Sequence, residues 1–366
     1  MPGGTGSAKP GTDQEHRDPV DPAGTFGPAQ DRYCRQSLLP EIGREGQRRL
    51  TGSRAVIVGL GALGSCVANN LVRAGVGQVV LIDRDLVELH NLQRQILYSE
   101  EDLNRPKAVA AAEILRKINT SVAIETHTKD FNVSNAESLL TGADVVLDGT
   151  DNLQTRFLIN DVCVKRGIPW VYAGAVGTGG MVMPILPGKT PCFRCLVPSL
   201  PGPGVLQTCD IAGVLNTIPS LIASLECTLA YQILTGRTDV ANGTSYLVHV
   251  DAWRQTFDRM TVTRRVDCPC CHEGMYEYLD AVAREMITSL CGRDAIQITP
   301  ATQMEIPLAE LEARLSRLGE ARLTPYMLTF RSGTEEFSIF RDGRAIIKGT
   351  KDEATARSLY ARYIGL

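Results

Sequence analysis

Short apolar runs alternate with amphipathic segments through the first half of the chain. The runs are rich in Val, Ile and Leu and have the length of buried strands: residues 55–58, 79–83, 122–125, 145–148 and 170–173. The segments between them have helical spacing: one that ends at 74, and those over 106–118, 134–140 and 152–165. Strands that are apolar on both sides are typical of a parallel sheet covered on both faces. The pattern therefore predicts a doubly wound, mainly parallel α/β fold.

Residues at the ends of these helices agree with the predicted boundaries. Pro106 stands in a first turn, where its missing N–H does no harm. Ser134 is expected to cap the helix over 134–140, and Gly75 and Gly167 follow the ends of two other helices.

The pattern changes after Gly180. Strand-like pieces, a long apolar helix and a small α+β arrangement follow, over residues 216–235 (helix), 245–250 and 255–263 (strands), 295–298 (strand), 308–318 (helix), 326–348 (hairpin) and 353–363 (helix). Arg341-Asp342-Gly343-Arg344 supplies the hairpin turn. We expect a first domain over residues 31–275, which includes the cysteine pairs described below, and a small α+β domain over 281–366. Residues 1–30 are rich in Gly, Pro and Asp and are expected to form a disordered tail.

Charge and hydropathy exclude some classes of function. The 366 residues include 38 Lys and Arg against 41 Asp and Glu, which gives a net charge of −3. Proteins with a general affinity for nucleic acids are usually basic, so we expect no nucleic-acid partner. No apolar run approaches the roughly 18 residues that span a bilayer, and the N-terminus lacks a basic segment and an apolar core. We therefore expect a cytoplasmic protein without stable membrane insertion.

A glycine loop joins the first predicted strand to the helix that follows it. Gly59-x-Gly61-x-x-Gly64 allows close backbone approach to phosphate, and the helix N-terminus offers free N–H groups. Asp83, at the end of the next strand, can accept hydrogen bonds from a ribose. The context predicts a Rossmann-like nucleotide site. The motif alone favours NAD, and a glycine turn needed only for packing is the alternative.

Two basic residues distinguish this sequence from a dehydrogenase. Arg94, within Asn91-Leu92-Gln93-Arg94-Gln95, and Lys107 both follow the strand that ends at Asp83. Ligands bind beyond the carboxyl ends of such strands, and an Arg with a Lys there suits a triphosphate. Solvated surface charges are the alternative. Asp151 follows another parallel strand and suits Mg²⁺, or else caps the helix that begins near Asn152.

The 11 cysteines include two C-x₂-C pairs, Cys192 with Cys195 and Cys268 with Cys271. Together they predict a tetrahedral site for structural Zn²⁺, with a redox disulfide as the alternative. Cys270 and His272 are further candidate ligands in the second pair, where the C-x₂-C spacing favours Cys271. The remaining cysteines have no such spacing: Cys66, Cys163 and Cys227 are expected in the core, Cys209 is a loop nucleophile or an ordinary loop thiol, and Cys34 and Cys291 stay unassigned.

From about residue 32 to residue 274 these motifs, with Arg32-Tyr33-Cys34-Arg35-Gln36 before them, resemble the ThiF/MoeB/HesA family, bacterial relatives of ubiquitin-activating enzymes. The resemblance implies adenylation by Mg·ATP of the C-terminal Gly-Gly carboxylate of a ubiquitin-like sulfur carrier such as ThiS or MoaD. It implies that Asp83 binds the ribose, that Asn91 belongs to the nucleotide site, and that Arg94 and Lys107 bind the phosphates. Asp151 would hold Mg²⁺. The backbone near Ala62 would contact the nucleotide, although members usually carry Gly there.

The same resemblance implies features beyond the nucleotide. Arg35 matches an arginine that reaches the phosphates from the neighbouring subunit of a homodimer. Cys209 matches a cysteine that can link covalently to the carrier. We recognise no rhodanese-like domain after the second cysteine pair, so a persulfide sulfur donor is expected to be another protein. The role of the last domain is not implied.

Two other classes of function remain open at this point. An NAD-dependent oxidoreductase agrees with the glycine loop but leaves Arg94, Lys107 and the cysteine pairs unexplained. An inactive scaffold of the same fold is the other. The pathway is also open among thiamine, molybdopterin, tRNA thiolation and cysteine synthesis.

Overall fold

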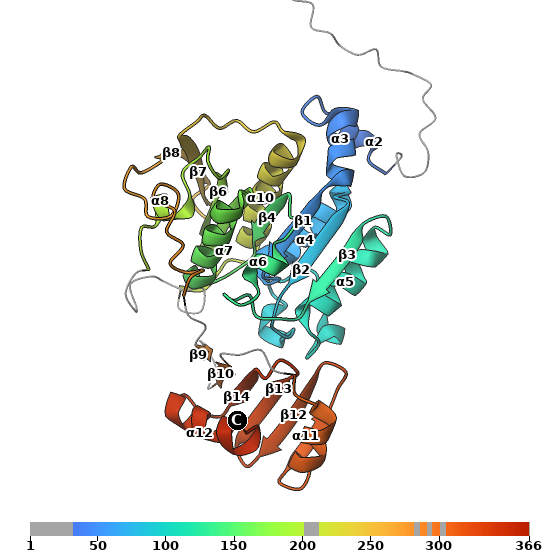
Figure 1. Cartoon of the computed structure of the whole chain (residues 1–366). Helices are drawn as coiled ribbons and strands as arrows, with labels where there is room; N and C mark the ends of the chain where they lie inside the picture. The colour runs from blue at the N-terminus through green and yellow to red at the C-terminus, as the bar shows by residue number, and fades with distance from the viewer. Residues whose placement is uncertain (1–31, 201–211, 282–285, 291–294, 301–304, 366) are drawn as a thin grey trace, which may run out of the picture.

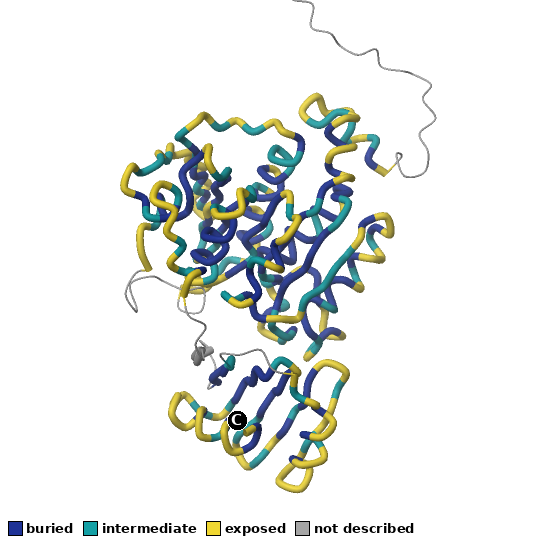
Figure 2. The backbone as a smooth tube through the Cα atoms, in the orientation of Figure 1, coloured by how far each residue is buried: buried dark blue, intermediate teal, exposed yellow. Residues whose placement is uncertain are grey.

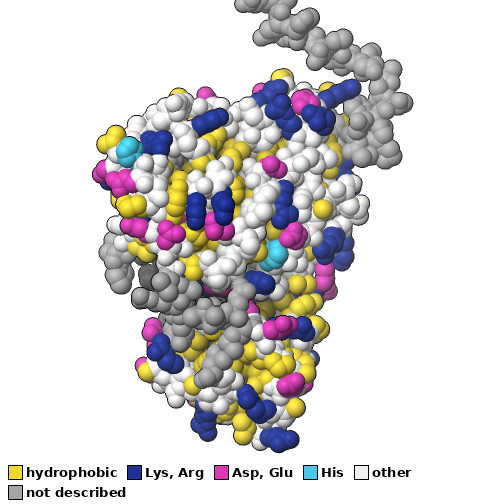
Figure 3. Space-filling view, viewed as in Figure 1, with side chains coloured by type: hydrophobic (Ala, Val, Ile, Leu, Met, Phe, Trp, Pro, Cys, Tyr) yellow, Lys and Arg dark blue, Asp and Glu magenta, His cyan; other side chains and the backbone are white. Residues whose placement is uncertain are grey.

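The structure is a computed structural model that describes residues 32–200, 212–281, 286–290, 295–300 and 305–365. Two β-sheets organise these residues, one in the larger upper part of Figure 1 and one in the lower part. The buried residues concentrate along the strands and on the helix faces packed against them (Figure 2). On the face shown in Figure 3, basic and acidic side chains are interspersed, in agreement with the near-neutral net charge.

The first sheet has the strand order β3-β2-β1-β4-β5-β6-β7-β8. Its parallel strands are β1 (Arg54–Val58), β2 (Gln78–Ile82), β3 (Ala123–His127), β4 (Val145–Asp148) and β5 (Trp170–Val176). The strands β6 (Gly179–Ile185), β7 (Thr244–Asp251) and β8 (Thr256–Thr263) continue the sheet antiparallel. The predicted doubly wound α/β fold is confirmed. The strand order reverses between β1 and β4, which is where ligands bind in such sheets.

Successive strand residues alternate between two cores, as the pleat requires. Ile57 and Leu81 join the core beneath α3 (Gly43–Gly52), α4 (Ala62–Ala74), α5 (Lys107–Ile118) and α10 (Thr217–Thr235). Val56 and Val80 join the core beneath α6 (Ala136–Leu139), α7 (Leu153–Arg166) and α8 (Phe193–Leu196). Cys163 lies in this second core. Further helical segments in the described residues beside this sheet are α2 (Cys34–Ser37) and two 3₁₀ turns, Leu89–Asn91 and Glu100–Asp102.

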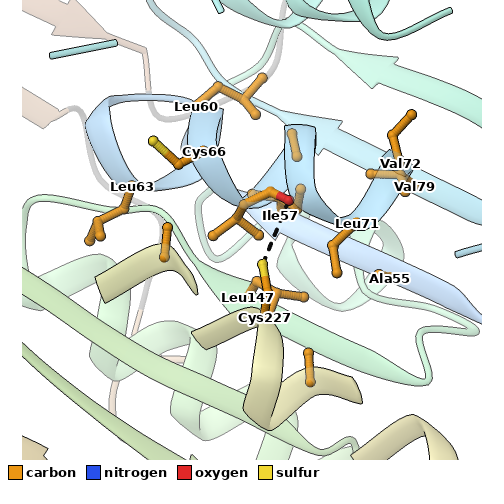
Figure 4. Close-up of a cluster of buried hydrophobic side chains, with 14 of the residues drawn as sticks. Ala55, Ile57, Leu60, Leu63, Cys66, Leu71, Val72, Val79, Leu147 and Cys227 are labelled. Carbon is orange, nitrogen blue, oxygen red and sulfur yellow. Dashed lines mark hydrogen bonds between the residues drawn. The ribbon is translucent and has the colours of Figure 1, made fainter. Parts of the chain in front are cut away.

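Two of the unpaired cysteines lie inside the first core. Figure 4 shows Cys66 and Cys227 among Leu63, Leu71 and Leu147, with the Cys227 thiol directed at a backbone carbonyl. The expectation that Cys66, Cys163 and Cys227 are small core residues is confirmed, because each is at most 2% exposed.

The expectation that no apolar run approaches the length of a membrane span is wrong for helix α10. Its 19 residues are long and apolar enough for such a span by length and composition. Ile218, Ile222 and Ala230 are nevertheless completely buried in the first core, and the helix packs against α4, β5 and β6. Its apolar character is accounted for by a core position.

The second sheet has the order β11-β12-β13-β14-β10-β9 and is antiparallel throughout. Its strands are β9 (Met286–Leu290), β10 (Ala295–Thr299), β11 (Glu320–Leu323), β12 (Met327–Ser332), β13 (Glu335–Phe340) and β14 (Ala345–Lys348). Helices α11 (Leu308–Leu315) and α12 (Glu353–Tyr363) cover one face over a third core. We call this sheet with its two helices the C-terminal unit. The domain boundaries at residues 30, 275 and 281 stay predictions.

Two local predictions were wrong. The segment 326–348 is three strands with two turns, because Gly333 (φ +65°) adds a turn before the one at Gly343 (φ +84°). Ser134 does not cap α6. The N-cap position belongs to Asn135, and the Ser134 hydroxyl instead donates to the side chain of Asn132.

Candidate functional site

A cavity of about 2470 Å³ lies between the carboxyl ends of the parallel strands and the C-terminal unit. Gly59, Asp83 and Asp151 line it from the first sheet, and Thr329 and Ser338 line it from the second. The first three residues follow β1, β2 and β4, so the cavity includes the point where the strand order reverses.

The glycine loop forms one wall of this cavity. Gly59 has φ +89°, and an added Cβ would lie 2.6 Å from the carbonyl oxygen of Gly149. A Cβ at Gly64 would collide with the Gly59 carbonyl. These two glycines are therefore required by close packing, in agreement with the alternative of a glycine turn needed for packing. Gly61 differs, because an added Cβ there meets nothing closer than 3.8 Å, and Ala62 begins α4 beside it. Packing thus leaves the N-terminus of α4 open to the cavity, as phosphate binding requires.

Asp83, Asp85 and Lys107 form a connected group at the end of β2. Asp83 is 7% exposed and accepts hydrogen bonds from the Leu60 N–H and the Asp85 N–H, each at 2.6 Å. Lys107 is the first residue of α5, and its Nζ lies 3.3 Å from the Asp85 carboxylate. The sequence predicted Asp83 and Lys107 but missed Asp85, which lies two residues after Asp83 and lines the same cavity.

Charge pairing sets the protonation of this group. Burial alone would lower the pKa of Lys107, but the carboxylates of Asp85, Asp83 and Asp151 raise it above its usual value. Burial raises the pKa of Asp83. Asp85 has a pKa below its usual range because Lys107 and Arg84 outweigh the effect of burial. Lys107 is consequently a nearly buried cation held by acids that stand beside it.

Arg94 and Asn91 line the same cavity from the connection between β2 and α5. The Arg94 guanidinium donates to the His90 carbonyl at 3.0 Å, which orients one end of its fork. The buried Asn91 amide closes the turn, because its oxygen accepts from the Glu88 N–H at 3.3 Å.

Asp151 has no helix-capping role. The N-cap of α7 is Asn152, whose side chain accepts a hydrogen bond from the Thr155 N–H at 2.8 Å. Asp151 is exposed at the cavity wall, where it raises the pKa of Lys107 and of Arg156. Its carboxylate is therefore open to a cation, and a Mg²⁺ ion suits such a donor near phosphate.

A buried network that the sequence did not reveal holds the backbone before Asp151. Asp148 is 0% exposed and accepts from Arg156 Nε at 2.7 Å and from the Thr150 hydroxyl at 2.6 Å. Arg156 also donates to the carbonyls of Thr150 and Ala173. Glu226, from α10, accepts from the Asp148 N–H at 2.8 Å. The loop after β4 is thereby fixed by α7, which follows it directly, by β5 and by the distant α10.

Two predicted site residues are not brought to this cavity. Arg35 is exposed on α2, which packs at the opposite end of the helices: Gln36 donates to the carbonyl of Ala74, at the end of α4. Figure 1 shows α2 beside α3, at the end of the sheet where β1 begins. Cys209 lies outside the described residues.

Four cysteine sulfurs form a separate cluster. Cys192, Cys195, Cys268 and Cys271 have their sulfur atoms within 4.8 Å of one another. Two of the separations, Cys192 to Cys268 and Cys195 to Cys271, are 3.6 and 3.5 Å. Sulfurs that bind one zinc at 2.3 Å lie about 3.8 Å apart in a tetrahedron. The cluster therefore fits Zn²⁺, and none of its members lines the cavity.

The fifth cysteine of this region has another partner. Cys270 is buried and accepts a hydrogen bond from the Asn160 amide at 3.2 Å. Neither Cys270 nor His272 belongs to the four-sulfur group, so the spacing argument for Cys271 agrees with the geometry.

Residues 33–270 match the ThiF family, which is more than half of the chain. The chain belongs to the ThiF family. Among its relatives, the sulfur carrier protein ThiS adenylyltransferase of Bacillus subtilis is 39% identical over 339 residues, covering 91% of this chain and 99% of the relative. The SAMP-activating enzyme E1 of Haloferax volcanii is 37% identical over 252 residues, covering 69% and 92%. The Bacillus match extends past residue 270, so this ThiF-family relative shares sequence with the C-terminal unit as well.

Solved structures support the fold. The crystal structure of E. coli MccB with MccA-N7isoASN superposes with a TM-score of 0.58 at 21% identity, covering 67% of this ThiF-family chain and 75% of that chain.

Proposed function

We propose that this protein is an adenylyltransferase that uses ATP to activate the C-terminal Gly-Gly carboxylate of a ubiquitin-like sulfur carrier. The observation that carries the proposal is the convergence of Lys107, Arg94 and Asp151 on one cavity beside the N-terminus of α4. Relatives of this chain are named as adenylyltransferases of sulfur carriers, one of them over nearly its whole length. The relatives therefore favour ATP over NAD, and the oxidoreductase alternative loses its support.

Each residue has a role that its surroundings allow. Asp83 binds the ribose. Gly61 and Ala62 let the phosphates approach the backbone at the start of α4, on a loop whose close packing needs Gly59 and Gly64. Asn91 shapes the turn beside them.

Lys107 and Arg94 neutralise the phosphates. The Lys107 ammonium exchanges its 3.3 Å contact with Asp85 for a phosphate oxygen, and Arg94 uses the side of its fork that does not bind the His90 carbonyl. Asp151 would hold Mg²⁺, which would supply further positive charge to the leaving phosphates. Asp151 suits Mg²⁺ because its carboxylate is exposed and does not cap α7.

The chemistry then needs little besides position and charge. The carrier carboxylate attacks the α-phosphorus of ATP, the bond to the bridging oxygen breaks, and pyrophosphate leaves. An ionised carboxylate requires no general base, which agrees with a site built from cations and acids. Zn²⁺ in the four-cysteine cluster has a structural role, because four protein ligands leave no position for water.

The quaternary arrangement is part of the proposal. Arg35 lies far from the cavity of its own subunit, so we propose a homodimer in which it completes the neighbouring site. The thiolate of Cys209, or the outer sulfur of a persulfide donor protein, then attacks the carbonyl carbon of the adenylated carrier, the acyl–phosphate bond breaks and AMP leaves. We propose that this takes place in the cytoplasm. Cys209→Ala should spare adenylation and impair thiocarboxylate formation.

Carrier-dependent exchange of labelled pyrophosphate into ATP tests the activity. Asp151→Ala and Arg94→Ala should each abolish exchange with unchanged thermal unfolding, because neither residue caps a helix or lies in a core. Arg73→Ala, on the exposed last turn of α4, is the matched control and should retain full exchange. Full exchange by either site variant would remove the site assignment. A wild-type protein that binds ATP without any exchange would be the inactive scaffold.

The carrier is identified separately. Mass spectrometry of small proteins ending in Gly-Gly that co-purify from the native host distinguishes the thiamine, molybdopterin, tRNA-thiolation and cysteine pathways.

A further inference from the structure

The segment of residues 83–87 lies between the candidate nucleotide site and the C-terminal unit. Its acidic residues, Asp83 and Asp85, belong to the site, as described above. The intervening Arg84 offers its backbone carbonyl to the other side, where Arg344 Nη2 donates to it at 2.8 Å. Leu86 packs against a small apolar cluster of the second sheet, formed by Ala295, Met327, Phe340 and Ile346. The segment is therefore held by the C-terminal unit at two places.

Arg344 is an unusual residue to bury. It stands in the turn between β13 and β14, is 0% exposed, and lies over the ring of Phe340 with 3.8 Å between the guanidinium carbon and the ring centroid. Its Nε lies 3.9 Å from the Asp342 carboxylate, and Nη1 has no acceptor among the residues that the structure describes. Burial lowers the pKa of this guanidinium. Burying a cation with so few partners costs free energy. Packing alone therefore does not explain why Arg344 is buried, whereas its hydrogen bond to the Arg84 carbonyl does.

The segment that Arg344 holds also fixes Lys107. The Lys107 N–H donates to the Asp85 carbonyl at 2.9 Å, and the Val87 N–H donates to the Arg105 carbonyl at 2.9 Å. These backbone bonds join the segment to the start of α5. A shift of Arg84 would consequently move the carboxylate of Asp83 and the ammonium of Lys107 together.

We propose that Arg344 is a positioning residue for the nucleotide site, through which the C-terminal unit holds residues 83–87 in the arrangement that binds ATP. This inference rests on the proposed function for the identity of the nucleotide. It gives the C-terminal unit a role in ATP affinity and assigns Arg344 no contact with substrate.

The test measures the Kd of Mg·ATP by calorimetric titration and the KM for ATP in pyrophosphate exchange. Arg344→Met keeps the apolar stem and removes the donor, and should raise both constants roughly tenfold, the effect of losing one charge-assisted hydrogen bond. The KM for the carrier and kcat should change less than twofold. Arg344→Lys restores one donor and should recover most of the affinity. Arg341→Met, exposed in the same turn, is the matched control and should match the wild type.

Each outcome has one meaning. Unchanged ATP constants in folded Arg344→Met, or equal impairment by Arg344→Lys, would overturn the proposal. A merely structural role would lower the amount of active enzyme, and thus kcat, with the Kd and KM for ATP unchanged. If Arg344→Met does not fold, Leu86→Ala removes the second contact instead, and normal ATP affinity in that variant would also overturn the proposal. A wild type that binds ATP but shows no exchange refutes the proposed function alone, since the titration still reads the positioning effect.

Discussion

At the scale of single residues, the site depends on ionisable groups placed where water is scarce. Lys107 is 6% exposed and stays charged because three carboxylates surround it. Asp148 is completely buried and remains acceptable there because Arg156 and Thr150 satisfy its oxygens. The positions of these groups are thus fixed before any ligand arrives, which reduces the reorganisation that adenylation requires.

Glu226 leads to a prediction about pH. Burial, together with the nearby Asp148, raises the pKa of Glu226 well above its usual value of 4.5, so the folded protein keeps this carboxyl protonated. Between pH 4.5 and the raised value the unfolded chain binds fewer protons than the folded one, and stability falls as pH rises. The variant Glu226→Gln keeps an oxygen that can accept the hydrogen bond from the Asp148 N–H, but its side chain cannot ionise.

The free energy of unfolding from urea titrations at pH 5.5 and pH 8 checks this prediction. Relative to Glu226→Gln, the wild type should lose stability with rising pH, by at most about 1.4 kcal/mol per pH unit. Parallel pH profiles for the two proteins would show that Glu226 ionises normally in the folded state.

At the scale of elements, the four-cysteine cluster joins two short pieces that have little regular structure. Cys192 is the N-cap of the four-residue α8 and Cys195 lies within it, and Cys268 and Cys271 lie in the turn segment after β8. Both pieces contribute buried residues to the second core, and a metal that crosslinks them would stabilise the fold further. The cluster lies on the side of the sheet away from α4 and α10.

This leads to a prediction about metal content. The purified protein should contain one zinc per chain by mass spectrometry, and Cys268→Ser should lose it with a fall in Tm on the order of 10 °C. Cys270→Ser is the matched control, because Cys270 binds the Asn160 amide and stands outside the four-sulfur group. Retention of zinc by Cys268→Ser, or its loss from Cys270→Ser, would contradict the assigned ligands.

The element boundaries show what local pattern predicts and what it does not. Strands β1, β2, β4 and β5 follow the predicted apolar runs, because burial on both faces leaves a strong signal in sequence. The extra turn at Gly333 was missed, since the alternating pattern continues through the strands on either side. The sequence also left open whether Asp151 caps the next helix or binds Mg²⁺. Only the geometry at the start of α7 identified Asn152 as the cap.

At the scale of the whole molecule, the proposed role of Arg35 would require a second subunit, because Arg35 is exposed on α2 and does not line the cavity of its own chain. Arg35→Ala and Asp151→Ala should each be inactive as purified proteins. In a mixed dimer one site would combine an intact Asp151 with an intact Arg35 from its neighbour, while the other site would lack both.

Mixing the two inactive variants under conditions that allow subunit exchange should therefore restore about a quarter of wild-type exchange activity, since half of the dimers are mixed and each has one complete site. Pyrophosphate exchange after mixing, with size-exclusion chromatography to confirm the dimer, provides the measurement. No recovery in a population shown to contain mixed dimers would place Arg35 outside the neighbouring site.

The sequence by itself determined the alternation of strands and helices, the glycine loop and the paired cysteines, because each is encoded in neighbouring residues by period, spacing or backbone freedom. The tertiary structure alone decided that Lys107 meets Asp85, that Glu226 supports the loop after β4, and that Arg344 holds Arg84. These contacts join residues separated by 22, 78 and 260 positions. Their existence depends on how the layers pack, and no local pattern of apolar and polar residues contains that information.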